Sequence, residues 1–138
     1  MFTYNIQLSG YDYNQYDEKG TTDYITFIKE VEQFPWIEQL KIYNDIQQGC
    51  TATISVTNHN SNSSLWISII GDIDTNNYII GYVYPKIIKT FLGLGKEKIK
   101  QWVDIYNIDD FGLAKELFAM FFNNDSLTLK VKLSQEEK

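Results

Sequence analysis

The sequence predicts an α+β domain: an antiparallel meander of about five to seven strands with two or three helices packed on one face. Apolar residues recur at helical spacing over residues 22–48 and again over 111–122, whereas a period of two dominates residues 51–84. Clusters of Asn, Asp and Ser separate the alternating runs, which favours hairpins. The 138 residues are a suitable length for a single domain spanning 1–138.

The first third of the chain predicts one strand, a loop and two helices. Residues 2–8 read as a strand, and the polar run 9–21 as a loop. Thr22 is a suitable N-cap for the first helix, with Asp23 in its first turn. Its inner positions are expected to be Ile25, Ile28 and Val31. Pro35 should end this helix and begin a second over 35–48, closed by Gly49. The inner stripe of the second helix is expected to hold Trp36, Ile37, Leu40 and Tyr43.

The middle of the chain predicts three strands of a meander. In 51–57, TATISVT, small apolar residues alternate with Thr and Ser, which indicates a half-buried strand. Its inward residues are expected to be Ala52, Ile54 and Val56. Residues 64–71 and 78–84 predict the next two strands, and Pro85 either ends the last one or marks a sheet edge.

The last third contains the least certain assignment. Residues 86–106 predict two strands, 86–92 and 99–106, around a loop at 93–98, although a short helix at 96–105 fits nearly as well. Asp109 or Asp110 should cap a helix over 111–122. Its inner side is expected to hold Leu113, Leu117, Met120 and Phe121. The alternation in 127–133, LTLKVKL, predicts a final strand. Its inward residues would be Leu127, Leu129, Val131 and Leu133.

The charge of the chain argues against nucleic-acid binding. The net charge is −6, and all twelve basic residues are Lys. Arg forks dominate phosphate and base-edge recognition, so an acidic chain without Arg is poorly suited to it. Residues 1–80 hold ten acidic residues against three Lys, hence a net charge of −7. An acidic surface there would attract a basic partner, although ordinary surface scatter explains the asymmetry equally well.

No residue constellation predicts catalysis. His59 is the only histidine and lies in a polar turn, while Cys50, the only cysteine, directly precedes a predicted strand. A straight strand would hold these two residues about 30 Å apart, which excludes a dyad. The paired carboxylates, such as Asp109 and Asp110, fit helix caps, turns or the tail better than acid–base pairs. We therefore expect a protein that is not an enzyme.

Metal and phosphate motifs are also incomplete. Asp72, Asp74 and Asn76 match the opening of a calcium loop, but Asn77 and Val83 stand where that loop needs Gly and Glu. The segment 93–98 contains G-x-G but lacks the rest of a phosphate-binding loop. We expect no metal and no cofactor.

The sequence offers no segment for a membrane or for secretion. No run approaches the roughly 18–20 apolar residues of a membrane span, and the N-terminus lacks the features of a signal peptide. With a single cysteine, these features favour a cytoplasmic protein without a membrane partner. The most basic stretch, 86–100, contains five Lys and reads as a sheet edge guarded against strand pairing, or else as a contact for an anionic surface.

Five segments together resemble small immunity proteins of bacterial polymorphic-toxin and contact-dependent growth inhibition systems. They are FPWIEQL at 34–40, TATISV at 51–56, LWISIIGD at 65–72, YIIGYVY at 78–84 and LFAMFFNND at 117–125. The resemblance implies an acidic, cytoplasmic α+β domain that binds a cognate, basic toxin domain and occludes its active or substrate-binding site. No functional residue is carried over with it.

Candidate partner-binding residues come from the acidic first half. Three tyrosines of the 9–21 loop could serve as anchors, because Tyr is frequent at hot spots, and five acids could engage basic residues of a toxin. These candidates are Tyr11, Asp12, Tyr13, Tyr16, Asp17, Glu18, Asp72 and Asp74. The alternative for the loop is an ordinary solvated segment. The alternative function is a non-catalytic module for a small molecule or peptide, with a pocket lined by Trp66, Tyr78, Tyr82 and Tyr84.

Overall fold

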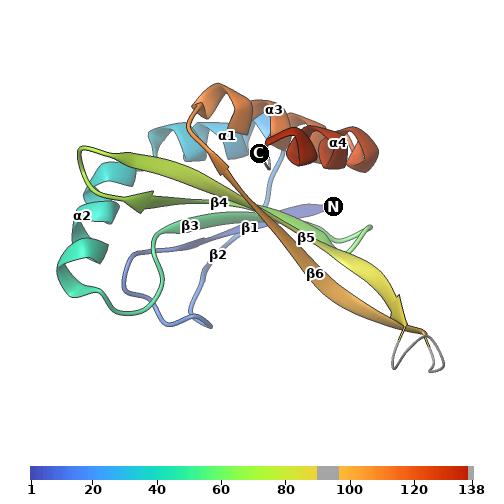
Figure 1. The fold of residues 1–138 in the computed structure, drawn as a ribbon, viewed down its shortest axis with the longest axis horizontal. Helices are drawn as coiled ribbons and strands as arrows, with labels where there is room; N and C mark the ends of the chain where they lie inside the picture. Colours follow the sequence, from blue (N-terminus) through green and yellow to red (C-terminus); the bar gives the residue numbers. More distant parts are fainter. Residues whose placement is uncertain (90–96, 137–138) are drawn as a thin grey trace.

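The computed structural model describes residues 1–89 and 97–136, which form one antiparallel sheet and four helices (Figure 1). The strands are β1 (Phe2–Gln7), β2 (Asp17–Thr21), β3 (Thr53–Asn58), β4 (Ser63–Gly71), β5 (Asn76–Lys89) and β6 (Glu97–Ile108). The helices are α1 (Tyr24–Gln33), α2 (Trp36–Ile46), α3 (Phe111–Phe122) and α4 (Ser126–Glu136). The predicted α+β class is confirmed, with one helix more than expected in these ranges.

The sheet has the order β2-β1-β3-β4-β5-β6, and every neighbouring pair is antiparallel. Strands β3 to β6 follow one another as hairpins, so the predicted meander is present. Helices α1 and α2 connect β2 to β3. As a result β1, the first strand, lies between β2 and β3.

The helices leave one face of the sheet uncovered. Helices α1, α3 and α4 lie over the other face, and α2 lies at the end of the sheet (Figure 1). Alternate residues of the strands point into the layer below these helices. The buried strand residues there include Tyr4, Ile6, Ile54, Val56, Leu65, Ile67, Ile69, Ile80, Tyr82, Tyr106 and Ile108.

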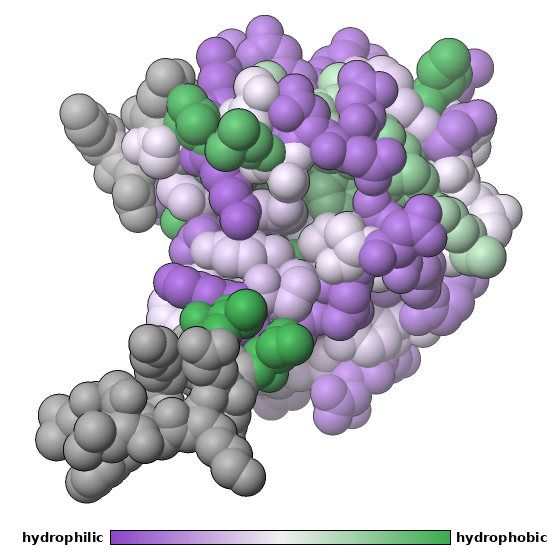
Figure 2. All heavy atoms as spheres, turned by 90° about the vertical axis from the view of Figure 1, so that its right-hand side faces the viewer, coloured by the Kyte–Doolittle hydropathy of each residue, from purple (hydrophilic) through white to green (hydrophobic). Residues whose placement is uncertain are grey.

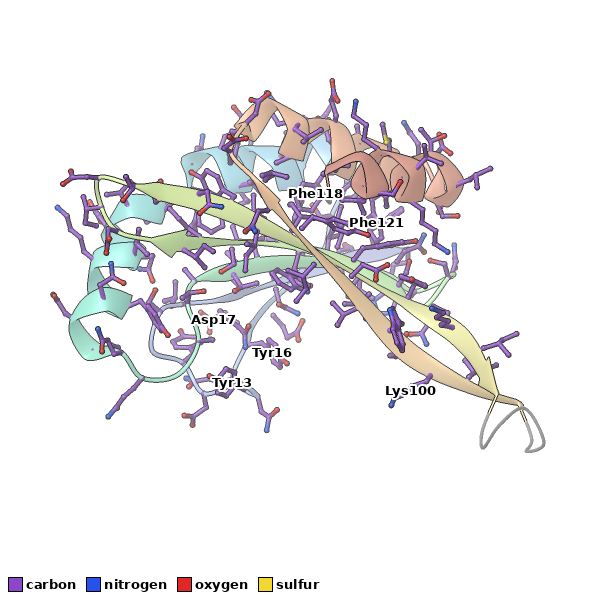
Figure 3. All side chains as sticks on the ribbon, in the orientation of Figure 1. Tyr13, Tyr16, Asp17, Lys100, Phe118 and Phe121 are labelled. Atoms are coloured by element: carbon purple, nitrogen blue, oxygen red, sulfur yellow. The ribbon has the colours of Figure 1, made fainter. Side chains whose placement is uncertain are left out.

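Aromatic rings from the helices fill the layer between sheet and helices. Phe27 of α1 and Phe118 of α3 are both fully buried, and their ring centroids are 4.9 Å apart. Figure 3 shows Phe118 and Phe121 on the side of α3 that faces the sheet. Full burial of one such side chain contributes about 1.5–3 kcal/mol. This layer therefore provides most of the driving force for folding.

The first helix begins one residue later than predicted. Asp23, not Thr22, is the N-cap, because its Oδ1 accepts a hydrogen bond of 2.8 Å from the backbone N–H of Thr26. With this start, Phe27 joins Ile28 and Val31 on the buried face, and Ile25 is exposed. The prediction of Ile25 as a core residue is therefore wrong.

The second helix is shorter than predicted at both ends. Pro35 lies at its N-cap, and Gln47 ends it in the left-handed conformation, with φ of 50°, two residues before Gly49. The N–H of Gln47 bonds the carbonyl of Tyr43, which closes the last turn. Of the expected inner stripe, Trp36 and Leu40 are buried, Tyr43 is half-buried and Ile37 is exposed.

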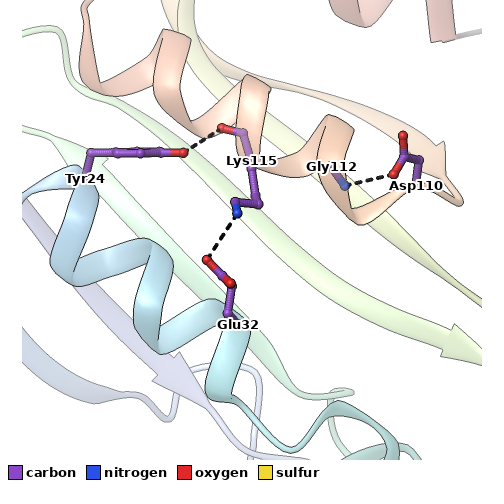
Figure 4. A network of polar contacts seen from close by, with 5 residues as sticks. All are labelled: Tyr24, Glu32, Asp110, Gly112 and Lys115. Atoms are coloured by element: carbon purple, nitrogen blue, oxygen red, sulfur yellow. Dashed lines mark hydrogen bonds and ion pairs between the residues drawn. The ribbon is translucent and has the colours of Figure 1, made fainter.

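Polar contacts fix α1 against α3 and begin α3 (Figure 4). The Tyr24 hydroxyl donates to the carbonyl of Lys115 at 3.4 Å, and the Lys115 Nζ lies 3.4 Å from Glu32 Oε1. Both charged groups of this ion pair are partly exposed, so it contributes little. Asp110 Oδ1 accepts from the Gly112 N–H at 2.9 Å, so Asp110, and not Asp109, is the cap of the two predicted candidates.

Strand β2 lies where the sequence predicted only a loop. Residues 17–21 pair with β1, with Thr21 opposite Thr3 and Asp17 opposite Ile6. The segment DEKGT has poor strand propensity. It is ordered by backbone pairing at the sheet edge rather than by burial, since four of its five residues are exposed. Local sequence carries no signal for such pairing.

Strand β5 continues through Pro85 instead of ending there. Its ladder with β4 ends at the Ser64–Val83 pair, whereas its ladder with β6 continues past Pro85, which lies opposite Gln101. Pro85 therefore lies in a stretch that is paired on one side only. Of the two predictions for Pro85, the sheet edge is correct and the strand end is wrong. Residues 84–89 and 97–102 form a two-stranded extension of the sheet (Figure 1), here called the arm.

Strand β6 resolves the ambiguity over residues 96–105. Residues 97–108 form a strand, so the alternative of a short helix is wrong. The pairing with β5, which an isolated sequence window does not reveal, decides between the two. The expected loop at 93–98 falls largely on residues 90–96, outside the described ranges.

The expected last strand, 127–133, is instead helix α4. Leu129 and Leu133, four residues apart, are buried, whereas Leu127 and Val131 are 76% and 52% exposed. Asp125 Oδ1 accepts from the Thr128 N–H at 3.2 Å and begins the helix. In LTLKVKL the same leucines satisfy both a period of two and an i, i+4 stripe, and packing beside α3 selects the stripe.

Candidate functional site

The uncovered side of the sheet, called the open face, changes from polar to apolar across its strands. Side chains on this face come from alternate positions of β1, β3, β4, β5 and β6. They include Thr3, Asn5, Gln7, Thr53, Ser55, Thr57, Ser64, Trp66, Ser68, Asn77, Ile79, Val83, Val103, Ile105 and Asn107. Amides lie on β1 and hydroxyls on β3 and β4. Strands β5 and β6 carry mainly aliphatic side chains, with Asn77 and Asn107 at one end.

One register row shows this gradient directly. Asn5 pairs with Ser55, Ser55 with Trp66, Trp66 with Gly81, and Gly81 with Ile105. Cross-strand partners point to the same side of a sheet, so these residues form a continuous line over five strands. A ligand or partner on this face would meet hydrogen-bonding groups at one end of the line and apolar surface at the other.

Trp66 lies across Gly81 in the middle of that line. A Cβ built on Gly81 would be 2.0 Å from Trp66 Cε2, so any larger residue at this position would collide with the indole. Glycine thus allows the ring to lie flat on β5. A half-buried indole held flat on a sheet is a platform suited to stacking or to a protein contact.

Hydroxyl pairs stiffen the polar half of the open face. Thr57 Oγ1 lies 2.8 Å from Ser64 Oγ, and Thr53 Oγ1 donates to Ser68 Oγ at 3.2 Å. Ser68, which is buried, donates in turn to the carbonyl of Ala52 at 2.8 Å. Each of these pairs crosses from β3 or its preceding residue to β4, so the two strands are tied by side chains as well as by backbone.

Three polar groups of the central row are free to bind. The side chains of Asn5 and Ser55 and the indole N–H of Trp66 make no hydrogen bond with any residue in the described ranges. They line a hollow of about 520 Å³, which is large enough to hold a small ligand or an inserted side chain.

Two of the predicted tyrosines form the rim of this hollow. Tyr13 and Tyr16 are 73% and 47% exposed, and both line the hollow together with Trp66. Figure 3 shows them on the side of the sheet away from Phe118 and Phe121. The Gln7 Nε2 donates to the carbonyl of Tyr13 at 3.2 Å and fixes the loop beside the open face.

The third predicted tyrosine, Tyr11, holds the loop in place. Its hydroxyl donates to Asp17 Oδ2 at 2.9 Å, and this hydrogen bond raises the pKa of Tyr11. Its carbonyl accepts from the Cys50 N–H at 3.1 Å. A Cβ on Gly49, whose φ is 73°, would lie 2.4 Å from the same carbonyl, so this connection requires glycine.

The predicted acidic residues are divided between two places. Glu18 is exposed and pairs with Asn5, next to the hollow, and Asp12 is exposed in the adjoining loop. Asp72 and Asp74 are exposed in the β4–β5 turn. Both places lie at the same end of the sheet, because β1 and β4 run parallel to each other. No contact brings the two groups together within the described ranges.

The aromatic pocket predicted for a small-molecule module is not formed. Trp66 belongs to the open face, whereas Tyr78, Tyr82 and Tyr84 point to the helix-covered face. The strand period of two separates them, because all three tyrosines occupy even positions of β5, whereas Gly81, the β5 partner of Trp66, occupies an odd position. Burial raises the pKa of Tyr78 and Tyr82, as expected for rings inside the core.

The described residues show no catalytic arrangement around Cys50 or His59. Burial raises the pKa of the Cys50 thiol, which opposes the thiolate form needed for nucleophilic attack. His59 lies in the β3–β4 turn, with a ring nitrogen 2.6 Å from Thr3 Oγ1. In the described ranges no three His, Cys, Asp or Glu residues are grouped closely enough to hold a metal ion.

Sequence reasoning missed the open face as a site, although its signal was present. The same alternation that predicted Ala52, Ile54 and Val56 as core also placed Ser55 and its neighbours opposite them. What the alternation cannot say is that no helix covers this second side. Nor does it reveal that Gly81 lies under Trp66, because that depends on the register between β4 and β5.

Comparison with known proteins adds no relative: no family model, no curated protein and no solved structure matches this chain. Among residues 1–89 and 97–136, none of the helices combines the length and apolarity needed to cross a bilayer.

Proposed function

We propose that this chain is a non-catalytic immunity protein of the cytoplasm. In this role it binds a cognate toxin domain through the open face of its sheet and occludes the active or substrate-binding site of that domain. The observation that carries the proposal is the open face itself. A sheet face that offers a flat Trp, exposed Tyr rings, unpaired polar groups and aliphatic side chains has the composition of a protein interface.

The positions of the aromatic residues suit a protein interface. Stable protein interfaces bury about 800 Å² on each partner, with aromatic anchors near the centre and polar groups at the rim. Trp66 is central on the open face, and Tyr13 and Tyr16 stand at its polar side. A convex toxin surface could place one side chain in the hollow between them.

Charge supports a basic partner. The chain carries a net charge of −6, and Glu18 and Asp12 are exposed beside the polar side of the hollow. Complementary charge mainly speeds the encounter and orients the partner, while the buried aromatic anchors hold the complex. Blocking then requires no chemistry from this chain, only a steric cover over the toxin site.

The test is affinity capture by the tagged chain in the cells that produce it, with bound proteins identified by mass spectrometry. We expect one stoichiometric partner that maps to the C-terminal part of a large exported protein and whose toxicity this chain suppresses. The Trp66→Ala variant should weaken binding of that partner by about 30-fold, as for a hot-spot residue. The Tyr13→Ala and Tyr16→Ala variants should weaken it less.

Ile42→Ala is the matched control, because Ile42 is an exposed apolar residue of α2, away from the open face. It should capture the partner as the unaltered chain does. Capture of no partner would contradict the proposed function, and undiminished capture by Trp66→Ala would contradict the open face as its interface.

The hollow favours a second candidate, a binding module for a small molecule or a short peptide. Its volume of about 520 Å³ lies within the range of ligand sites, and the unpaired Asn5, Ser55 and Trp66 groups converge on it. A ligand that raises the melting temperature of the unaltered chain but not of Trp66→Ala would support this candidate. If the chain captures a toxin and no ligand stabilises it in this way, the second candidate function is contradicted.

A further inference from the structure

Strand β6 ends the sheet with an edge on which no described strand pairs. This edge is twelve residues long, and only one side of its backbone is paired, with β5. It also carries apolar side chains at the surface. Ile99 and Ile105 are 76% and 56% exposed, and Trp102 and Val103 are exposed as well. Figure 2 shows strongly hydrophobic residues at the surface beside the tip of the arm.

We propose that this edge pairs with the same edge of a second copy of the chain, antiparallel and centred on Trp102, to form one continuous sheet. In this register Trp102 faces Trp102 of the second copy. Residues at equal distances on either side of the centre then lie opposite each other, so every contact occurs twice, as in any two-fold interface.

Charge complementarity selects the second copy as the occupant. In the Trp102-centred register, Lys100 of each copy lies opposite Asp104 of the other, on the same side of the sheet as Trp102. Within one copy, Lys100 lies opposite Lys86 across the arm, and neither makes an ion pair with a described residue. The second copy thus supplies the carboxylate that this lysine pair lacks.

Asp104 is already oriented for this contact. Its Oδ2 accepts from the Tyr84 hydroxyl at 2.8 Å and its Oδ1 from the Trp102 indole N–H at 3.2 Å. Lys86 Nζ lies over the Trp102 ring at 4.3 Å from its centroid. These contacts hold Asp104 and Trp102 in fixed positions on one side of the strand, so the edge is preorganised.

The opposite side of the strand fits the same register. Ile99 of each copy lies opposite Ile105 of the other, and Gln101 lies opposite Val103. Both Ile99–Ile105 pairs would bury side chains that are now exposed.

Neighbouring registers fit less well. A shift of the centre to Val103 places Trp102 opposite Asp104 and Ile99 opposite Asn107. A shift to Gln101 places Lys100 opposite Trp102, and both shifts separate Lys100 from Asp104. Lys100, one of the Lys residues that read as guards against pairing, therefore acts against other registers while permitting this one.

The test is the mass of the chain in solution by light scattering and sedimentation, which requires no toxin and is independent of the proposed function. The unaltered chain should dimerise. Lys100→Glu should raise the dimer Kd by about ten- to thirtyfold, because it sets Glu opposite Asp104 twice. Asp104→Lys should do the same by setting two lysines opposite each other. An equimolar mixture of the two variants should restore the dimer, since both pairs are then opposite in charge.

Lys41→Glu on α2 is the control of equal charge and should dimerise normally. A second readout does not depend on the charge variants. In a Cys50→Ala background, Trp102→Cys should form a disulfide-linked dimer under mild oxidation, because residues opposite each other have Cα atoms about 4.5–5.5 Å apart. Ile105→Cys should not, because its two copies would lie about 20 Å apart.

Three results would overturn the proposal. They are a monomer at every concentration reached, a dimer that Lys100→Glu leaves intact, and two variants that each fold as monomers but fail to pair when mixed. Circular dichroism of each variant verifies folding, and if Asp104→Lys does not fold, the two cysteine variants decide the register.

Discussion

On the helix-covered side of the sheet, Phe27 and Phe118 are fully buried beside aliphatic side chains of the strands. The open face is built from the same strands, but there Trp66 is half-exposed among serines and threonines. The first side stabilises the fold through buried area, and the second leaves aromatic surface and unpaired polar groups accessible. Because the two sides alternate along each strand, one can change without the other. This separation makes it practical to test stability and binding independently.

The largest expected difference between the two sides is in stability. Phe118→Ala should lower the free energy of unfolding by about 3–5 kcal/mol, because it leaves a cavity between α1, α3 and the sheet. Trp66→Ala removes a ring that is only half-buried, and it should cost clearly less. Urea unfolding of both variants, followed by far-UV circular dichroism, measures the two values. Equal losses would mean that the open face also serves as core.

The close approach of Trp66 to Gly81 permits a sharper test of the open face alone. Gly81→Ala should cost about 1–3 kcal/mol, as overpacking does, because the new methyl group displaces the indole from β5. The added cost should largely disappear in the Trp66→Ala background, where the space is empty. A double-mutant cycle by urea unfolding gives this coupling. Additive costs would show that the indole does not occupy this position.

The sequence predicted the central strands and helix α3 correctly, but it missed helix α4 and strand β2. Residues 51–84 have both strong alternation and turn clusters, so local pattern and tertiary structure agree there. For 127–133 the pattern was equally clear, yet Leu129 and Leu133 belong to a helix. A seven-residue run fits both periods, and only the packing of Leu129 beside α3 distinguishes them. Strand β2 was missed because its sequence has no strand pattern, and only its pairing with β1 orders it.

The candidate site was predictable only in part. Tyr13 and Tyr16 were chosen for their residue type and position in a polar loop, and the structure places both on the rim of the hollow. Tyr11 was chosen on the same grounds, but its hydroxyl is used internally by Asp17. Residue type indicates which side chains suit an interface. It does not indicate which of them the loop already uses.

The smallest expected effect concerns Tyr84, which points to the helix-covered side and carries Lys130 Nζ 4.4 Å above its ring. Burial, together with the hydrogen bond to Asp104, raises the pKa of Tyr84 from 10.0 to about 12. Since the folded pKa is the higher one, Tyr84 stabilises the fold fully below pH 10, and this contribution is lost as the pH rises toward about 12. Tyrosinate formation can be followed by absorbance in the unaltered chain and in Tyr84→Phe. The difference between the two titration curves should correspond to one tyrosine with a midpoint near pH 12.

The free energy of unfolding should also fall more steeply with pH in the unaltered chain than in Tyr84→Phe over this interval, because only the former has a proton to lose at this position. Tyr78 and Tyr82, whose pKa values burial also raises, are present in both chains and cancel in the difference. A difference spectrum with a midpoint at the ordinary value of 10.0 would mean that the Tyr84 hydroxyl is in water and not covered by α4.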